Sequence, residues 1–211
     1  MIKSSIRKNT FRAIYRFLDR FSPVPFDCGR ICGAACCQAD EEHNLGLYLL
    51  PGEEKVHDRR DPWLSWEKHS TELYDFPPSW QGSVYFVNCE GPGHCRRALR
   101  PIQCRTFPLQ PVIREEEEKS PLAEKRPVYR EAGSPLALIY YPAPLPYSCP
   151  LIEEGARLSL PFLRATYLVW KHLIRDPLIY DWVRYNGVSG SPSPAEESAG
   201  GSPLPEGEKA L

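Results

Sequence analysis

Cysteine is the residue type in this chain whose number and spacing most clearly indicate chemistry. All eight cysteines fall between residues 28 and 149, and four of them lie within the run CGRICGAACC. Thiolates are the soft ligands that zinc and iron–sulfur centres prefer. Because four thiolates complete one tetrahedral site, eight suffice for two centres. The candidate metal ligands are Cys28, Cys32, Cys36, Cys37, Cys89, Cys95, Cys104 and Cys149.

The redox compartment decides whether cysteines bind metal or pair with each other. The N-terminal segment lacks an uninterrupted apolar core and a small-residue cleavage site, so we expect no secretory signal. No window approaches the roughly 18 apolar residues of a membrane-spanning helix, and we expect a cytoplasmic protein. In that reducing compartment thiols bind metals more often than they form disulfides. Disulfides or plain buried thiols are the alternative interpretation.

The spacing of the cysteines differs from the common metal-binding motifs. Zinc sites usually pair their ligands as C-x2-C or C-x4-C, whereas this chain has C-x3-C-x3-CC from Cys28 to Cys37. The C-x3-C-x2-C pattern of radical S-adenosylmethionine enzymes is absent, because residue 35 is alanine and not cysteine. The ferredoxin pattern C-x2-C-x2-C-x3-C-P is absent as well. The number of ligands therefore predicts a metal centre and leaves the metal open between zinc and an iron–sulfur cluster.

The complete set of motifs resembles the YkgJ-type cysteine-cluster family. The resemblance rests on FDCGRICGAACC, the C-x5-C pair at 89–95, RPIQCRTFP at 100–108 and the CP at 149–150. LLPGEE at 49–54 is similar to a segment of many members, and the resemblance covers residues 24–150. The first block of the family is usually C-x2-C-x2-CC, so both gaps are one residue longer here.

The resemblance implies a metal-binding protein. The family is described as chelating zinc or iron through eight characteristic cysteines, and each of the eight positions has a match in this chain. It has no settled general activity, although some flagellin lysine methylases carry a related domain. An iron–sulfur redox or protein-modifying enzyme, linked to methylation by this analogy, is the alternative function.

Two arginines flank the proposed ligand Cys104. Arg100 and Arg105 are candidates for cofactor binding, because hydrogen bonds to sulfur would offset the negative charge of a thiolate-ligated centre; surface or ion-paired arginines are the alternative. Among the histidines, His94 is embedded between ligand positions in GPGHC and is a candidate ligand or hydrogen-bond donor. We expect the others to be surface residues: His43, His57, His69 and His172.

The segment before the cysteines is predicted to form a basic amphipathic helix. Over residues 4–21, apolar side chains recur at helical spacing, and the basic residues are set against a single acid, Asp19. Such a helix can lie on a membrane surface, which makes a membrane-surface adaptor a third functional interpretation. We favour a helix docked on the domain with a solvated basic face.

The remaining patterns predict the elements that position the cysteines. Proline and glycine in residues 22–50 favour irregular ligand loops, and the Glu115–Glu118 run favours a solvated loop. SVYFVNC and LALIYY are rich in β-branched and aromatic residues and predict strands. Helices are expected to begin near Glu53 and Glu54, to include WLSWEKHSTEL after Asp61-Pro62, to cover 157–174, and to run from Asp176-Pro177 to Gly187.

Together these elements predict an α+β fold, in which a small irregular cysteine-rich metal-binding domain has flanking helices. We divide the chain into a basic helix at 1–21, the cysteine-cluster domain with C-terminal helices at 22–186, and a disordered tail at 187–211, where Gly, Ser and Pro dominate. The net charge of −1 gives no reason to expect nucleic acid as a partner. The expected partner is a metal ion or cluster.

Overall fold

The cysteine-bearing segments belong to a fold that combines helices with two small antiparallel sheets. The computed structural model describes residues 1–38, 46–114, 125–142 and 144–189. The mixture of helix and sheet confirms the predicted α+β class. Glu115–Glu118, His43 and most of the expected disordered tail lie outside the described residues.

Each sheet has a central strand that the sequence pattern predicted. The first sheet has the order β1-β3-β2 and the second has the order β4-β6-β5, with all neighbours antiparallel. The strands are β1 (Leu47–Tyr48), β2 (Leu64–Ser70), β3 (Ser83–Cys89), β4 (Leu109–Ile113), β5 (Tyr129–Arg130) and β6 (Leu136–Tyr140). The central strands β3 and β6 coincide with SVYFVNC and LALIYY, so these two predictions are confirmed.

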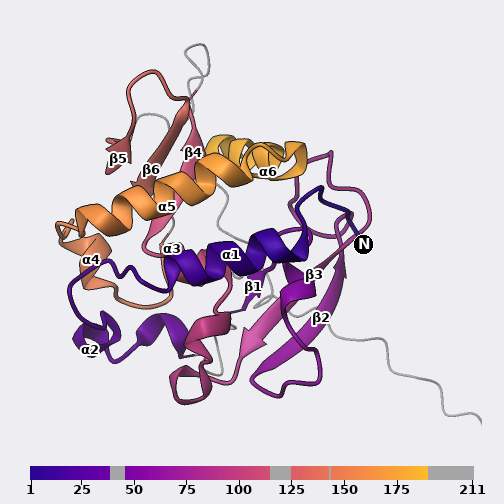
Figure 1. Cartoon of the computed structure of the whole chain (residues 1–211), viewed down its shortest axis with the longest axis horizontal. Coiled ribbons are helices and arrows are strands. Elements are labelled where there is room, and N and C mark those ends of the chain that lie inside the picture. The colour runs from indigo at the N-terminus through magenta and orange to yellow at the C-terminus, as the bar shows by residue number, and fades with distance from the viewer. Residues whose placement is uncertain (39–45, 115–124, 143, 190–211) are drawn as a thin grey trace, which may run out of the picture.

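Three long helices pack between and over the sheets, while the cysteine segments contain only short helical turns. Figure 1 shows α1 and α5 crossing the centre of the molecule, with the two sheets on opposite sides of α1. The long helices are α1 (Lys8–Leu18), α5 (Leu160–Leu173) and α6 (Pro177–Ser189). The short α-helices are α2 (Gly29–Cys32), α3 (Ile102–Thr106) and α4 (Pro150–Glu153). The 3₁₀ turns are η1 (Ala35–Cys37), η2 (Glu53–Val56), η3 (Pro92–His94) and η4 (Arg97–Leu99).

The largest core cluster joins α1, α5 and the second sheet and reaches the helix that carries Cys104. Phe11, Leu138 and Tyr167 have no exposed surface, and neither does Ile102, the first residue of α3. Burial of each large apolar side chain contributes about 1.5–3 kcal/mol. Helix α3 is therefore fixed to the main core at its first residue, two positions before Cys104.

The predicted N-terminal helix exists and is docked on the domain. It begins at Lys8 rather than near residue 4, because Ser4 and Ser5 donate three hydrogen bonds of 2.6–2.9 Å to the Asp176 carboxylate and lie outside the helix. Its apolar face packs in the core through Phe11, Ile14, Tyr15 and Leu18. That face is therefore not available to a lipid surface, in agreement with the docked interpretation.

The helix predicted for WLSWEKHSTEL is wrong, because most of this segment forms strand β2. Its residues pair with β3 along their whole length, from Leu64 opposite Cys89 to Ser70 opposite Ser83. Thr71 and Gly82 close the hairpin with mutual hydrogen bonds of 3.0 and 3.1 Å. Glu67 and Lys68 favour a helix, but they pair with the apolar strand β3 instead. Packing against cross-strand neighbours often outweighs the local helix propensity of a residue.

The two predicted C-terminal helices are present. Pro161 lies in the first turn of α5, where a missing backbone N–H costs no hydrogen bond. Asp176 accepts hydrogen bonds from the backbone nitrogens of Leu178 and Ile179 and so caps α6. Gly187 does not end this helix, which continues to Ser189, so the predicted boundary between helix and tail lies at least two residues too early.

Candidate metal centre

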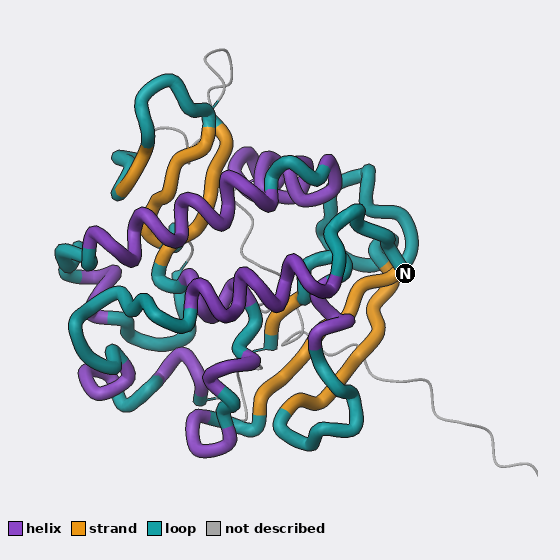
Figure 2. The backbone as a smooth tube through the Cα atoms, in the orientation of Figure 1, coloured by secondary structure: helices purple, strands orange, loops and turns teal. Residues whose placement is uncertain are grey.

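All eight cysteines are free thiols, and they come from short turns, strand ends and helix starts. Cys28 precedes α2 and Cys32 ends it, Cys36 and Cys37 lie in η1, and the others are Cys89 at the end of β3, Cys95 after η3, Cys104 in α3 and Cys149 before α4. Figure 2 shows that loops and short helical turns predominate on the side of the molecule that carries the first of these segments. Tertiary packing thus brings together segments that lie far apart in the sequence.

The thiols border two adjoining cavities. The outer cavity has a volume of about 1030 Å³. The inner cavity has a volume of about 30 Å³. Six cysteines line the outer cavity: Cys28, Cys36, Cys37, Cys89, Cys95 and Cys104. Four line the inner cavity: Cys28, Cys32, Cys36 and Cys149. Cys28 and Cys36 border both cavities, and each of the other six thiols borders one of them.

The thiols border shared space without forming a compact group of metal ligands. The sulfurs of Cys36 and Cys37 lie 3.9 Å apart. Within the described residues, no three His, Cys, Asp or Glu side chains lie close enough together to hold one metal ion. Cys104 is exposed, yet burial raises its pKa, because its accessible surface faces the outer cavity. The donor set fits a soft metal by its chemistry, because thiolates are soft ligands.

A tight turn between α2 and η1 directs Cys36 and Cys37 toward this space. Gly33 and Ala34 both have left-handed backbone conformations, with φ of +66° and +61°. Ala34 donates its N–H to the carbonyl of Gly29 at 2.8 Å, and the turn is so close that a Cβ on Gly29 would lie 3.2 Å from that of Ala34. A non-glycine residue in this conformation is strained, as often happens at functional sites.

In the adjacent pair Cys36–Cys37, one of the two thiols loses its proton more easily than the other. The two sulfurs lie 3.9 Å apart, where either thiol can donate a hydrogen bond to the other, and this interaction lowers the pKa of Cys37 to about 6 and raises that of Cys36. Burial opposes the shift in Cys37, while Arg100 and Arg97 add to it. Thiolates are the form that binds metals and reacts as nucleophiles, so Cys37 is ready to do either near neutral pH.

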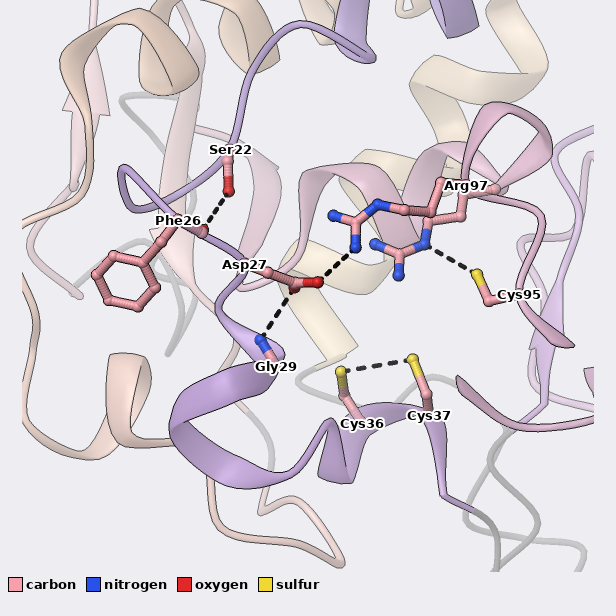
Figure 3. Close-up of polar contacts among 9 residues, drawn as sticks. Ser22, Phe26, Asp27, Gly29, Cys36, Cys37, Cys95 and Arg97 are labelled. Carbon is pink, nitrogen blue, oxygen red and sulfur yellow. Dashed lines mark hydrogen bonds and ion pairs between the residues drawn. The ribbon is translucent and has the colours of Figure 1, made fainter. Parts of the chain in front are cut away.

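Arg100 lies where the sequence pattern placed it, beside a cysteine. Its Nε donates a hydrogen bond to the sulfur of Cys95 at 3.0 Å. Next to it, Arg97 forms an ion pair of 2.6 Å with Asp27, whose other oxygen accepts the N–H of Gly29 at 3.2 Å. Figure 3 shows Cys36, Cys37 and Cys95 around the space beside Arg97 and Asp27. The contact between Arg100 and Cys95 supplies positive charge where thiolates would accumulate negative charge.

Arg105 supports the backbone of the site rather than a sulfur. Its Nε donates to the carbonyl of Arg100 and its Nη2 to the carbonyl of Arg97, each at 2.7 Å. Its Nη1 pairs with Asp19 at 3.3 Å, and the guanidinium lies 4.8 Å from the ring centre of Tyr15. Of the two arginines predicted to contact sulfur, Arg100 does so in the structure, and Arg105 holds the loop between Cys95 and Cys104.

Glu53 is a supporting residue whose role sequence reasoning missed. Its carboxylate is completely buried and accepts hydrogen bonds from the Tyr15 hydroxyl at 2.6 Å and from the backbone nitrogens of Ile102 and Leu50 at 2.8 and 3.1 Å. Burial raises its pKa. The signal in the sequence was an acidic residue that follows an apolar run across a Pro-Gly turn in LLPGEE, a position that we interpreted only as a helix start.

None of the four histidines that the structure describes lines either cavity. His94 is exposed, and its Nδ1 lies 2.9 Å from the carbonyl oxygen of Glu90. The prediction that His57 lies on the surface is wrong, since it is buried beside Tyr15 with 3.1 Å between Nε2 and the hydroxyl. His69 is half-buried against Tyr48, with 2.7 Å between Nδ1 and the hydroxyl. The site is therefore one of thiols and arginines among the described residues.

Comparisons with known proteins assign no family or function to this chain. No protein-family model, no curated protein and no solved structure matches the chain. Among the described residues, no helix is both long and apolar enough to cross a membrane.

Proposed function

We propose that this protein binds metal through its cysteines, as zinc ions or as an iron–sulfur cluster. The observation that carries the proposal is the placement of eight free thiols, from segments far apart in the sequence, around two adjoining cavities. Buried free cysteines alone would need only apolar neighbours, whereas here the sulfurs of Cys36 and Cys37 lie 3.9 Å apart and Arg100 donates a hydrogen bond to the sulfur of Cys95. The proposal agrees with the resemblance of the motifs to the YkgJ-type cysteine-cluster family.

The chemistry of these residues suits such a centre. The ligands would be the eight cysteines, and Cys37 would enter binding already as a thiolate. Arg100 would offset the charge of the centre through its hydrogen bond to Cys95, and Arg105 would keep the carbonyls of Arg97 and Arg100 in place. A bound zinc would supply structural cross-links between distant segments, and a cluster would supply electron transfer.

A second candidate function is a redox or protein-modifying enzyme built on an iron–sulfur centre. The outer cavity favours it, because about 1030 Å³ is the size of a small-molecule site and six thiols line it. Aromatic side chains such as Trp170 and Tyr147 share its wall with Arg97 and Arg100, which would allow both stacking and anion binding. This candidate requires iron and sulfide, whereas a structural zinc protein requires neither.

One experiment tests the proposal and separates the two candidates. The full chain is purified without oxygen, and zinc, iron and acid-labile sulfide are measured per chain. Stoichiometric zinc with a colourless protein supports a structural or chelating role. Iron with matching sulfide and a brown colour supports the iron–sulfur candidate. Protein that carries no metal and takes up neither zinc nor iron on reconstitution overturns the proposed function.

A further inference from the structure

The exposed sides of α1 and α5 carry positive charge without acidic residues between the cations. Neither helix contains an Asp or Glu, although the whole chain has 27 acidic residues against 26 Lys and Arg. The two helices pack against each other, and Figure 1 shows them running across the same face of the molecule. The exposed and unpaired cations of these helices and of their C-terminal ends form what we call the basic face: Lys8, Arg12, Arg16, Arg20, Arg164 and Arg175.

Four of these cations form a row along α1. Lys8, Arg12 and Arg16 follow one another at intervals of four residues, and Arg20 continues the row just beyond the helix. Residues four apart lie on the same side of a helix, so like charges at this spacing destabilise it. Arg7 and Lys8 also stand at the N-terminus of α1, where the helix dipole favours acids, and the first turn contains none. Natural sequences that break such local rules often do so at functional sites.

The fold does not neutralise the basic face. Within the residues that the structure describes, none of its six cations forms an ion pair. Asp19, which precedes Arg20, is paired with Arg105. Lys171 of α5 pairs with Glu131 at 2.6 Å and is therefore left out of the face. The charge of the face thus remains available to a partner of opposite charge.

Two exposed leucines alternate with a cation on α5. Leu160, Arg164 and Leu168 follow one another at intervals of four residues, and 48% of Leu160 and 51% of Leu168 are exposed. Cations beside exposed apolar side chains suit the surface of an anionic bilayer, because the headgroups attract the cations and the leucines leave water at the edge of the acyl chains. A nucleic-acid backbone would match the charge but would offer the leucines no apolar partner.

We propose that the basic face binds the anionic surface of a lipid membrane. The contact uses the exposed side of α1 while its apolar side stays in the core, so the protein lies on the bilayer as a folded domain. Clusters of about four to eight Lys and Arg on an amphipathic helix are typical of binding to anionic phospholipids. This interaction goes beyond the proposed metal-binding function and does not depend on it.

The test is co-sedimentation of the full chain with vesicles of phosphatidylcholine alone or of phosphatidylcholine mixed with phosphatidylserine. We expect binding only to the mixed vesicles, and weaker binding as added salt screens the charges. Arg12→Gln combined with Arg16→Gln should reduce this binding about 30-fold, since each cation contributes about 1 kcal/mol and about 1.4 kcal/mol corresponds to tenfold. The matched control removes two exposed cations outside α1 and α5, by Lys68→Gln combined with Arg126→Gln, and should bind nearly as well as the wild type.

Several results would overturn the membrane contact while leaving metal binding intact. Wild-type protein that does not sediment with the mixed vesicles at low salt contradicts it, and so does equal binding to phosphatidylcholine alone. An equal loss of binding in the control pair would place the contact elsewhere on the surface. Binding to a nucleic-acid duplex instead of the vesicles would assign the face to that partner. If the α1 variant does not fold by circular dichroism, Arg164→Gln combined with Arg175→Gln tests the same face from α5, with the same expected loss.

Discussion

The Oε1 atom of Glu53 lies 2.8 Å from the backbone nitrogen of Ile102, the first residue of the short helix that carries Cys104. The same oxygen accepts the Tyr15 hydroxyl at 2.6 Å, and the other oxygen accepts the N–H of Leu50 at 3.1 Å. One buried carboxylate therefore links the N-terminal helix, the LLPGEE segment and a proposed ligand helix. Helix starts leave backbone N–H groups without partners, and buried ones must be satisfied.

Replacing Glu53 should test this linkage. Glu53→Ala leaves the buried N–H groups of Ile102 and Leu50 without an acceptor and leaves the Tyr15 hydroxyl with His57 as its remaining partner, so we expect a loss of about 2–4 kcal/mol in the free energy of unfolding. Glu53→Gln retains one acceptor oxygen and should lose less. Chemical denaturation followed by circular dichroism measures both. Glu54→Ala, which removes an acceptor for Gly52 only, is the control; a loss as large as that of Glu53→Ala would contradict the special role of Glu53.

The buried histidine predicts a pH dependence of stability. Burial, followed by the nearby Arg105, lowers the pKa of His57 to about 4, whereas an unfolded chain has a histidine pKa of about 6.5. As the pH falls through this window, the unfolded chain binds a proton that the folded protein does not, so stability is lost from about pH 6.5 to 4. His57→Gln should lose less stability than the wild type over that range.

The measurement is the free energy of unfolding from urea titrations at several pH values. Comparing wild type and variant at each pH cancels the effect of acid on the cysteines, which both proteins share. The exposed His172→Gln is the matched control and should reproduce the wild-type profile. Parallel profiles for wild type and His57→Gln would show that the buried ring does not contribute.

The two arginines should differ in what they support. Arg100→Gln removes the hydrogen bond to the Cys95 sulfur, and we expect metal affinity to fall about 10–100-fold with little change in fold. Arg105→Gln removes hydrogen bonds to two carbonyls and should lower the stability of the protein first, with metal loss as a consequence. Competition with a chelator and thermal unfolding, measured on both variants, check this contrast. Equal effects of the two substitutions in both assays would be evidence against it.

A substitution in the strained turn before η1 is expected to keep or raise the stability of the protein, unlike the substitutions above. Ala34 has φ of +61°, a conformation that costs a non-glycine residue about 1–2 kcal/mol. Ala34→Gly removes this strain but adds entropy to the unfolded chain, about 0.4–1 kcal/mol, so stability should stay equal or rise slightly. Ala35→Gly, in the helical turn that follows, should instead lower stability by about 0.5–1 kcal/mol. Chemical denaturation of the two variants distinguishes them, and an equal loss in both would contradict the strained geometry.

The elements with strong local signals could be predicted from the sequence. SVYFVNC and LALIYY became the central strands, and Asp176-Pro177 capped a helix, because β-branched runs and helix caps act through immediate neighbours. WLSWEKHS carried helix-favouring residues and still formed a strand, because its pairing with β3 depends on a partner beyond a twelve-residue turn. Such a pairing cannot be read from the segment alone.

The candidate site, too, could be predicted only where its features are local in the sequence. The cysteines could be singled out as candidate ligands by their type, and Arg100 by its place beside them in the sequence, but the grouping around two cavities arises from tertiary packing. Glu53 could not be recognised, because its hydrogen-bond donors come from Tyr15 and Ile102, far from it in the sequence. The role of Arg105 also depends on carbonyls of the loop that precedes it, which only the folded backbone presents.

The measurement that tests the central claim most directly is X-ray absorption at the edge of the bound metal in anaerobically purified protein. If the cysteines are the ligands, the first shell should contain only sulfur, at about 2.3 Å for zinc. A cluster would add a shell of neighbouring metal atoms. A first shell of nitrogen and oxygen would contradict cysteine ligation, and so would a metal that remains with the same spectrum after Cys104→Ser and Cys149→Ser are combined.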